Sequence, residues 1–235
     1  MNERKRTASE SEAVELKKSK KTLFETIAAH GCRTGERDDM QDTFILSPLF
    51  SFGDMSDLSR CSFFAIFDGH AGSKASEFCQ KHMETVLKEK LSKFEDLMSA
   101  QKALKSTFIE TYKNIDEQFL TLAKSNKPVW KDGSTASTML IINNTIFVAN
   151  IGDSKAVVAR QKDDGSLSPV CLTVDHNPMA HEERMRIQKT GAIVKDGRVN
   201  GIIEVSRSFG DLPFKNLGVT CVPDMKKLTL GQGDL

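Results

Sequence analysis

The sequence predicts an α+β domain, in which helices are segregated against antiparallel sheet. Two observations favour this class. Two helical stripes of apolar residues follow one another between residues 75 and 122, and short strands joined by tight turns come after them, between residues 134 and 173. Helices and strands grouped in this way are typical of α+β folds, whereas alternating helices and strands would indicate parallel βαβ units.

The first predicted strands precede the helices. Residues 42–46 include Thr, Phe and Ile, and residues 62–67 are almost wholly apolar; both compositions are typical of strands. The loop between them, residues 51–60, is rich in Ser, Gly and Asp. The second strand runs directly into Asp68-Gly69-His70, so an acid, a glycine and a histidine stand at its exit.

The two helices are indicated by apolar residues at steps of three and four along one face. The first follows Ser73, a favourable N-cap residue, and the second covers residues 104–122. Both stripes are expected to face the core. Their members are Ala75, Phe78, Cys79, Met83, Val86, Leu87 and Leu91 in the first helix, and Leu104, Phe108, Tyr112, Ile115, Phe119 and Leu122 in the second.

Turn residues divide the rest of the chain into short elements. Asn143-Asn144 predicts a hairpin turn, Gly152-Asp153-Ser154 turns the chain into the next strand, and Asp163-Asp164-Gly165 closes that strand. A short helix is predicted from about Ala180 to Gly191, which is a natural left-handed C-terminal position. The predicted strands are residues 134–142, 145–150, 155–160, 170–173 and 201–205.

The composition is that of a globular protein. Of 235 residues, 39% are hydrophobic and 28% charged, with a net charge of +1, which argues against wholesale disorder and against a strongly basic nucleic-acid binder. The five cysteines are scattered and odd in number, and no apolar run approaches the length of a membrane span. We therefore expect a protein of a reducing compartment, cytoplasmic or nuclear, with no nucleic-acid or membrane partner. It is also expected to be a monomer.

The first 21 residues differ from the rest. They carry the basic clusters Arg4-Lys5-Arg6 and Lys17-Lys18-Ser19-Lys20-Lys21 and are expected to be a disordered tail. Two basic clusters with a short spacer are typical of a bipartite nuclear import signal, although a solvated, charge-rich arm explains them equally well. Residues 22–235 are expected to form one domain.

Asp68-Gly69-His70 is the first candidate for chemistry. A carboxylate at the end of a buried strand is held rigidly, and one carboxylate can bridge two hard cations. Gly69 has no Cβ, so its carbonyl can approach an ion closely, and His70 could pass a proton to a leaving group. The alternative is a simple Asp-Gly turn, which is also what we expect of the pairs at 132–133, 164–165 and 196–197.

Further motifs occur in a fixed order around this tripeptide. They are Gly35-Glu36-Arg37-Asp38-Asp39-Met40-Gln41-Asp42, Asp132-Gly133-Ser134-Thr135-Ala136, Ala149-Asn150-Ile151-Gly152-Asp153-Ser154 and Val205-Ser206-Arg207-Ser208-Phe209-Gly210-Asp211. Together they resemble the metal-dependent PPM-type (type 2C) protein serine/threonine phosphatases over roughly residues 33–234. Residues 130–135 and 182–188 look most like a kinase-associated member of that family. The resemblance implies a two-layer antiparallel β-sandwich flanked by helices.

The resemblance also implies an enzyme that hydrolyses phosphoserine and phosphothreonine with two Mn²⁺ or Mg²⁺ ions, which activate a water. Arg37 would hold the substrate phosphate, and His70 would protonate the leaving oxygen. Phosphoproteins would be the substrates, and a kinase-associated scaffold is a candidate partner. The implied metal residues are Asp68, bridging both ions, Gly69 through its carbonyl, Asp42 mainly through water, and Asp153 for a further, weaker ion.

Two departures from the family pattern bear on activity. Gln41 stands where many members have a glutamate, and the chain ends before the strands that supply two further metal-binding aspartates in the family. We therefore expect a domain that is incomplete at its C-terminus, with weakened metal binding. Three readings stay open at this point: an active phosphatase, a weak or inactive pseudophosphatase that acts as a binding module, and an incomplete record of a longer protein.

A cysteine-dependent phosphatase is a rival with less support. Its motif places a loop between a thiolate and an arginine, but the loop from Cys32 to Arg37 is one residue too short, and the motif should link a buried strand to a helix. Gly152-Asp153-Ser154 is similarly close to a nucleophile elbow, but a strand, not a helix, is predicted after it.

Overall fold

The computed structural model describes residues 26–231 and 233–234. The two basic clusters and most of the expected tail lie outside these residues, so the tail boundary and the import signal stay predictions. No helix formed by residues 26–231 or 233–234 combines the length and the apolar character that crossing a membrane requires.

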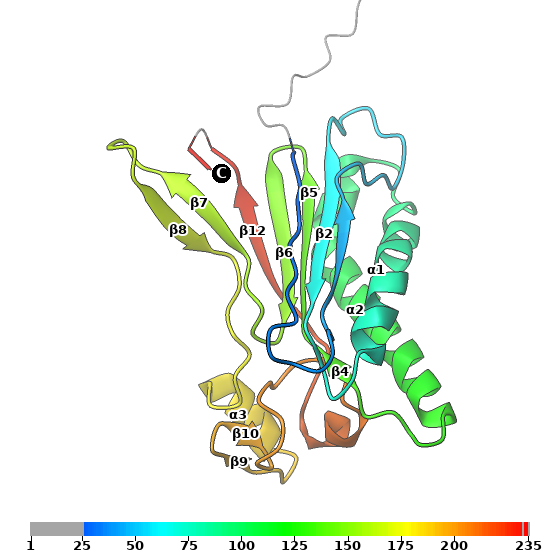
Figure 1. Ribbon diagram of the computed structural model, residues 1–235. Coiled ribbons are helices and arrows are strands. Elements are labelled where there is room, and N and C mark those ends of the chain that lie inside the picture. The colour runs from blue at the N-terminus through cyan, green and yellow to red at the C-terminus, as the bar shows by residue number, and fades with distance from the viewer. Residues whose placement is uncertain (1–25, 232, 235) are drawn as a thin grey trace, which may run out of the picture.

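A five-stranded antiparallel sheet forms the centre of the molecule (Figure 1). The hairpin predicted at Asn143-Asn144 is present: Asn143 has a φ of +52°, and Ile142 pairs with Thr145 across the turn. In spatial order the strands are β1 (Thr43–Ser47), β2 (Cys61–Phe67), β5 (Ala136–Ile142), β6 (Thr145–Ile151) and β12 (Asp224–Thr229).

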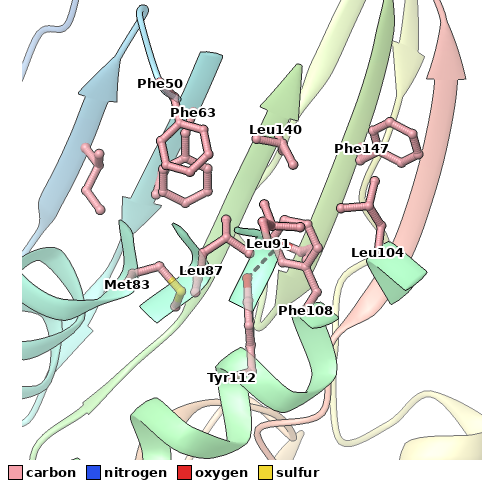
Figure 2. Packing of buried hydrophobic residues seen from close by; sticks show 14 of the residues in the cluster. Phe50, Phe63, Met83, Leu87, Leu91, Leu104, Phe108, Tyr112, Leu140 and Phe147 are labelled. Carbon is pink, nitrogen blue, oxygen red and sulfur yellow. Dashed lines mark hydrogen bonds between the residues drawn. The ribbon is translucent and has the colours of Figure 1, made fainter. Parts of the chain in front are cut away.

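Two helices, α1 (Lys74–Leu91) and α2 (Leu97–Ser125), cover one face of this sheet. The residues of their predicted apolar stripes are buried or half-buried, except Leu122, which is 40% exposed, so the prediction that Leu122 faces the core was wrong. Figure 2 shows Leu87 and Phe108 among side chains of the sheet. The hydroxyl of Tyr112, itself fully buried, donates a hydrogen bond of 3.0 Å to the carbonyl of Ala149 on β6. Burial of each large apolar side chain contributes about 1.5–3 kcal/mol, so the helices hold the sheet in place.

The opposite face is covered in part by a hairpin of β7 (Val157–Gln161) and β8 (Leu167–Cys171). Val158 from this hairpin packs with Ile146 and Val148 of the sheet. Elsewhere on the same side, Ile66 remains 51% exposed. Among the residues that the structure describes, the second layer of the expected sandwich is therefore a short hairpin over part of the sheet.

A smaller unit lies at the end of the sheet where β2 terminates (Figure 1). It contains α3 (His181–Gln188) and has its own apolar core, which includes Ile187, Val199 and Val205. Its other elements are β9 (Val194–Lys195), β10 (Arg198–Val199) and the 3₁₀-helix η1 (Leu212–Leu217). A three-stranded sheet beside it consists of β11 (Phe209–Gly210), β4 (Gly133–Ser134) and β3 (Gly69–His70).

Several local predictions were wrong. Residues 201–205 form no strand: Gly201 has a φ of +72°, and only Ile203 forms an isolated bridge, to Val199. Their apolar side chains serve the small core instead of a sheet. Asp132-Gly133 is not a turn, because Gly133 begins β4. The predicted strand over 134–142 is also interrupted at Thr135.

Candidate active site

A cleft of about 700 Å³ opens between the end of β2 and the small unit. Five of the predicted site residues line it: Arg37, Asp68, Gly69, His70 and Asp153. Asp42, the sixth, lies outside the cleft wall but acts on Asp68 through its charge. The structure therefore brings together residues that the sequence separates by more than a hundred positions.

Asp68 is fixed by its backbone. Its carbonyl accepts a hydrogen bond of 2.9 Å from the N–H of Thr135, and its own N–H donates to the hydroxyl of Thr135 at 3.3 Å. The pKa of the Asp68 carboxyl is raised, first by burial and then by the negative charges of Asp42 and Asp153, against the opposing effects of His70 and Arg37. The negative charges of Asp42 and Asp153 near this carboxyl create a site that attracts a cation.

Gly69 is required by close packing. A Cβ at this position would overlap the backbone carbonyl of Gln41 and the hydroxyl of Ser76. Gly69 pairs with Ser134 in the small sheet, which holds its peptide beside the cleft. A side chain here would force the segment that contains Gln41 away from β3.

His70 has a partner that the sequence did not identify as a site residue. Its Nε2 lies 2.7 Å from Oδ2 of Asp211, whose side chain is only 2% exposed. Burial lowers the pKa of His70, but the hydrogen bond and charge of Asp211, with Asp68 and Asp153, outweigh it and raise that pKa overall. Gly133 lies against this pair, and a Cβ there would overlap both side chains. The ring of His70 is therefore held in one orientation at the edge of the cleft.

A buried ion pair anchors the strand that leads to Asp211. Asp116 on α2 accepts a hydrogen bond of 2.8 Å from the N–H of Gly210 and lies 2.8 Å from Nζ of Lys215. Lys215 also donates to the carbonyl of Ser208 at 2.9 Å. Burial raises the pKa of Asp116, and Lys215 opposes that shift. Helix α2 thus fixes both sides of the segment that contains Asp211.

Asp132 takes over a role expected of Ser73. Ser73 precedes α1 as predicted, but its hydroxyl donates to the carboxylate of Glu77 and caps no backbone group. Oδ1 of Asp132 instead accepts a hydrogen bond of 3.1 Å from the N–H of Lys74. The carbonyl of Asp132 also accepts from the N–H of Asp211 at 3.0 Å. Asp132 therefore joins the start of α1 to the partner of His70.

Comparison with known proteins identifies the family. The family model described as "Protein phosphatase 2C" matches residues 28–234. This chain belongs to the protein phosphatase 2C family. Its integrin-linked kinase-associated serine/threonine phosphatase 2C relatives from human and mouse are 42% identical over 86% of this chain and 52% of their own length. A probable protein phosphatase 2C of Arabidopsis thaliana is 38% identical over 83% of this chain and 58% of its own.

Solved structures of similar fold agree with this assignment. A C. elegans sex-determining protein superposes with a TM-score of 0.70 and 25% identity, over 85% of this chain and 47% of the other. A Toxoplasma gondii serine-threonine phosphatase 2C superposes with a TM-score of 0.69 and 21% identity, over 84% of this chain and 72% of the other, which supports the fold. The predicted α+β class and family are confirmed. The protein phosphatase 2C chain spans about half the length of the curated relatives that it matches.

Protein phosphatases 2C are metal-dependent, and the donors in this cleft suit hard divalent cations. Asp68 offers carboxylate oxygens and Gly69 a carbonyl, the ligands that Mg²⁺ and Mn²⁺ prefer. The set is incomplete within residues 26–231 and 233–234, where no three His, Cys, Asp or Glu side chains lie close enough together to hold an ion. Asp42 and Asp153 are near enough to act on Asp68 by charge without completing a ligand group.

The segment containing Cys32 does not support the cysteine-dependent alternative. Residues 26–42 form neither a strand nor a helix, and Cys32 is exposed. Such a phosphatase needs a thiolate loop between a buried strand and a helix N-terminus. Ser154 is likewise followed by strand β7 and not by a helix, which is not the geometry of a nucleophile elbow.

Proposed function

We propose that this chain is a metal-dependent protein serine/threonine phosphatase domain that hydrolyses phosphoserine and phosphothreonine in phosphoproteins. One observation supports this most strongly: the carboxylate of Asp68, the histidine pair of His70 with Asp211, and Arg37 all border one cleft. A phosphoryl-transfer site needs these three functions side by side, namely a cation site, a proton donor and a phosphate ligand. The protein would act as a monomer.

The residues have separate roles in this proposal. The guanidinium of Arg37 would bind the phosphate through its planar fork of donors. Asp68 and the carbonyl of Gly69 would hold two Mn²⁺ or Mg²⁺ ions, with Asp42 acting mainly through water. Asp153 would help to bind a further, weaker ion. The bound ions would supply Lewis-acid activation of the attacking water. His70, oriented by Asp211, would protonate the serine or threonine oxygen as it leaves.

Phosphate release from a phosphothreonine peptide tests the proposal. Purified residues 1–235 are assayed with Mn²⁺ and with a chelator, beside Asp68→Asn and the control Asp163→Asn in an exposed turn. We expect release that requires Mn²⁺, is reduced about a hundredfold or more by Asp68→Asn, and is unchanged by Asp163→Asn. Folded wild-type protein that releases no phosphate, yet binds the peptide, would instead support the binding-module alternative.

The cellular partners and location are also part of the proposal. The name of the human relative describes association with a kinase, and a kinase-associated scaffold is our candidate partner here. Residues 1–30 fused to a fluorescent reporter should accumulate in the nucleus if the two basic clusters act as an import signal. An evenly distributed reporter would leave the cytoplasm as the expected location.

A further inference from the structure

A buried histidine outside the cleft, His176, contacts the loop that contains Asp153. His176 is 2% exposed, and both of its ring nitrogens are hydrogen-bonded. Nδ1 accepts a bond of 3.1 Å from the N–H of Gly152, and Nε2 lies 3.1 Å from Oδ2 of Asp224. The backbone N–H of His176 also donates to the carbonyl of Gly152 at 2.9 Å. One residue thus binds both polar groups of the Gly152 peptide backbone.

The other end of the loop is held by different residues. The hydroxyl of Ser154 lies 2.8 Å from that of Thr135, and the carbonyl of Ser154 accepts from the hydroxyl of Ser137 at 3.1 Å. Gly152 has a φ of +90°, and a Cβ there would press on the side chain of Thr135. Asp153 lies between these two fixed ends. Thr135, which Ser154 contacts, also binds the backbone of Asp68 through its N–H and its hydroxyl.

His176 is itself fixed by the small unit. Its carbonyl accepts a hydrogen bond of 2.9 Å from the N–H of Ser206. Asp224, its side-chain partner, lies 2.8 Å from Arg207, which in turn contacts Glu183 of α3 at 2.7 Å. The charged groups facing His176 are therefore Arg207, Asp224 and, beyond them, Glu183. The histidine joins this network to the cleft.

We propose that His176 is a positioning residue that binds the Gly152 backbone and thereby sets Asp153 beside Asp68. The role of Asp153 toward a divalent cation rests on the proposed function. The hold of His176 on the Gly152 backbone, which we call the clamp, does not. Loss of the bond from Gly152 to Nδ1 would let the loop open while the rest of the fold stays intact. Asp153 would then be free to leave the cleft, and cation binding would weaken.

Two substitutions separate the two bonds of the ring. The amide oxygen of asparagine lies near the position of Nδ1, so His176→Asn can still accept from Gly152, whereas glutamine reaches toward Asp224 instead. His181→Asn, at an exposed histidine of α3, is the matched control. The readouts are amide hydrogen exchange at residues 152–154, Mn²⁺ binding by calorimetry, and thermal unfolding, all on residues 1–235.

We expect His176→Gln to accelerate exchange at residues 152–154 about tenfold, the effect of one lost hydrogen bond, and to weaken Mn²⁺ binding several-fold. His176→Asn should stay within about threefold of wild type in both, as should His181→Asn. Equal effects of the Asn and Gln variants, or none in either, would overturn the clamp. A wild-type chain that binds no Mn²⁺ would count against the proposed function alone. Amide hydrogen exchange at residues 152–154 would still show whether His176 holds the loop.

A measurement on the unsubstituted chain covers the case in which a variant fails to fold. Long-range ¹H–¹⁵N correlation spectra report which ring nitrogen of His176 carries the proton. The hydrogen bond from Gly152 requires an unprotonated Nδ1 and a protonated Nε2. A proton on Nδ1 at neutral pH would exclude the bond to Gly152 and with it the proposal.

Discussion

His70 and Asp211 show how one side chain determines what another can do. The carboxylate of Asp211 is almost fully buried and lies 2.7 Å from Nε2 of His70, while Ser208 donates its hydroxyl to the same oxygen. An imidazole held in this way presents its ring to the cleft in a single orientation. With His70 as the proton donor, this orientation should speed phosphate release most for substrates whose leaving oxygen must be protonated.

Asp211→Asn should therefore discriminate between substrates. We expect kcat for a phosphothreonine peptide to fall about a hundredfold, because its alkoxide is a poor leaving group that requires protonation. Release of p-nitrophenolate, which leaves without a proton, should change less than about threefold. Steady-state kinetics with both substrates measure the difference, and an equal loss on both would argue against a role through proton transfer.

At the scale of elements, α1 and α2 act as the support of the sheet from which the cleft residues emerge. Phe108 and Tyr112 of α2 are fully buried against it, and Asp116 one turn later binds the backbone of β11. The same helix thus contributes to the apolar core and to the site. Loosening its packing should disturb both.

Phe108→Ala should lower the free energy of unfolding by about 3–5 kcal/mol, because it removes a large buried side chain and leaves a cavity. Urea unfolding, followed by the fluorescence of Trp130, measures the change. Glu117→Ala, at an exposed position of the same helix, is the control and should shift stability by less than about 0.5 kcal/mol. A loss below about 1 kcal/mol for Phe108→Ala would show that the core relaxes around the gap.

For the whole molecule, one charged network connects the small unit to the central sheet. Glu183 of α3 lies 2.7 Å from both Arg186 and Arg207, and Arg207 lies 2.8 Å from Asp224 at the start of β12. Burial alone would raise the pKa of Glu183, but hydrogen bonds from Arg186, Arg207 and Ser206 hold that pKa well below its usual range. A carboxyl with a depressed pKa stabilises the fold only while it is ionised.

This network predicts a loss of stability in acid. Glu183 contributes fully above the pKa of about 4.3 that a glutamate has in the unfolded chain, and its contribution declines progressively as the pH falls below that value. Asp116, whose pKa is raised by burial, destabilises the fold as the pH rises, which is opposite to the effect of Glu183. The test therefore compares wild type with a variant that lacks only the Glu183 carboxylate. The gap in urea midpoint between wild type and Glu183→Gln should be largest at pH 7 and shrink toward pH 3; a constant gap would contradict the linkage.

Features with a local pattern could be predicted from the sequence, and features built from distant residues could not. The helices, the Asn143-Asn144 hairpin and Asp68-Gly69-His70 each have a signal within a few residues. Asp211 is 141 residues from His70, and Gly210 is 94 residues from Asp116, so no spacing rule identifies these pairs. Strand β12 lacks a clear apolar alternation because it is half exposed, and two lysines stand at its centre.

The separation between His70 and Asp211 also bears on the order of events during synthesis. The N-terminal part of a chain leaves the ribosome first, and contacts between distant residues form late. Helices α1 and α2 can pack against the early strands once residue 151 has emerged, whereas His70 must wait for residue 211. A nascent chain would therefore spend an interval with its core largely formed while His70 still lacks the carboxylate that orients its ring.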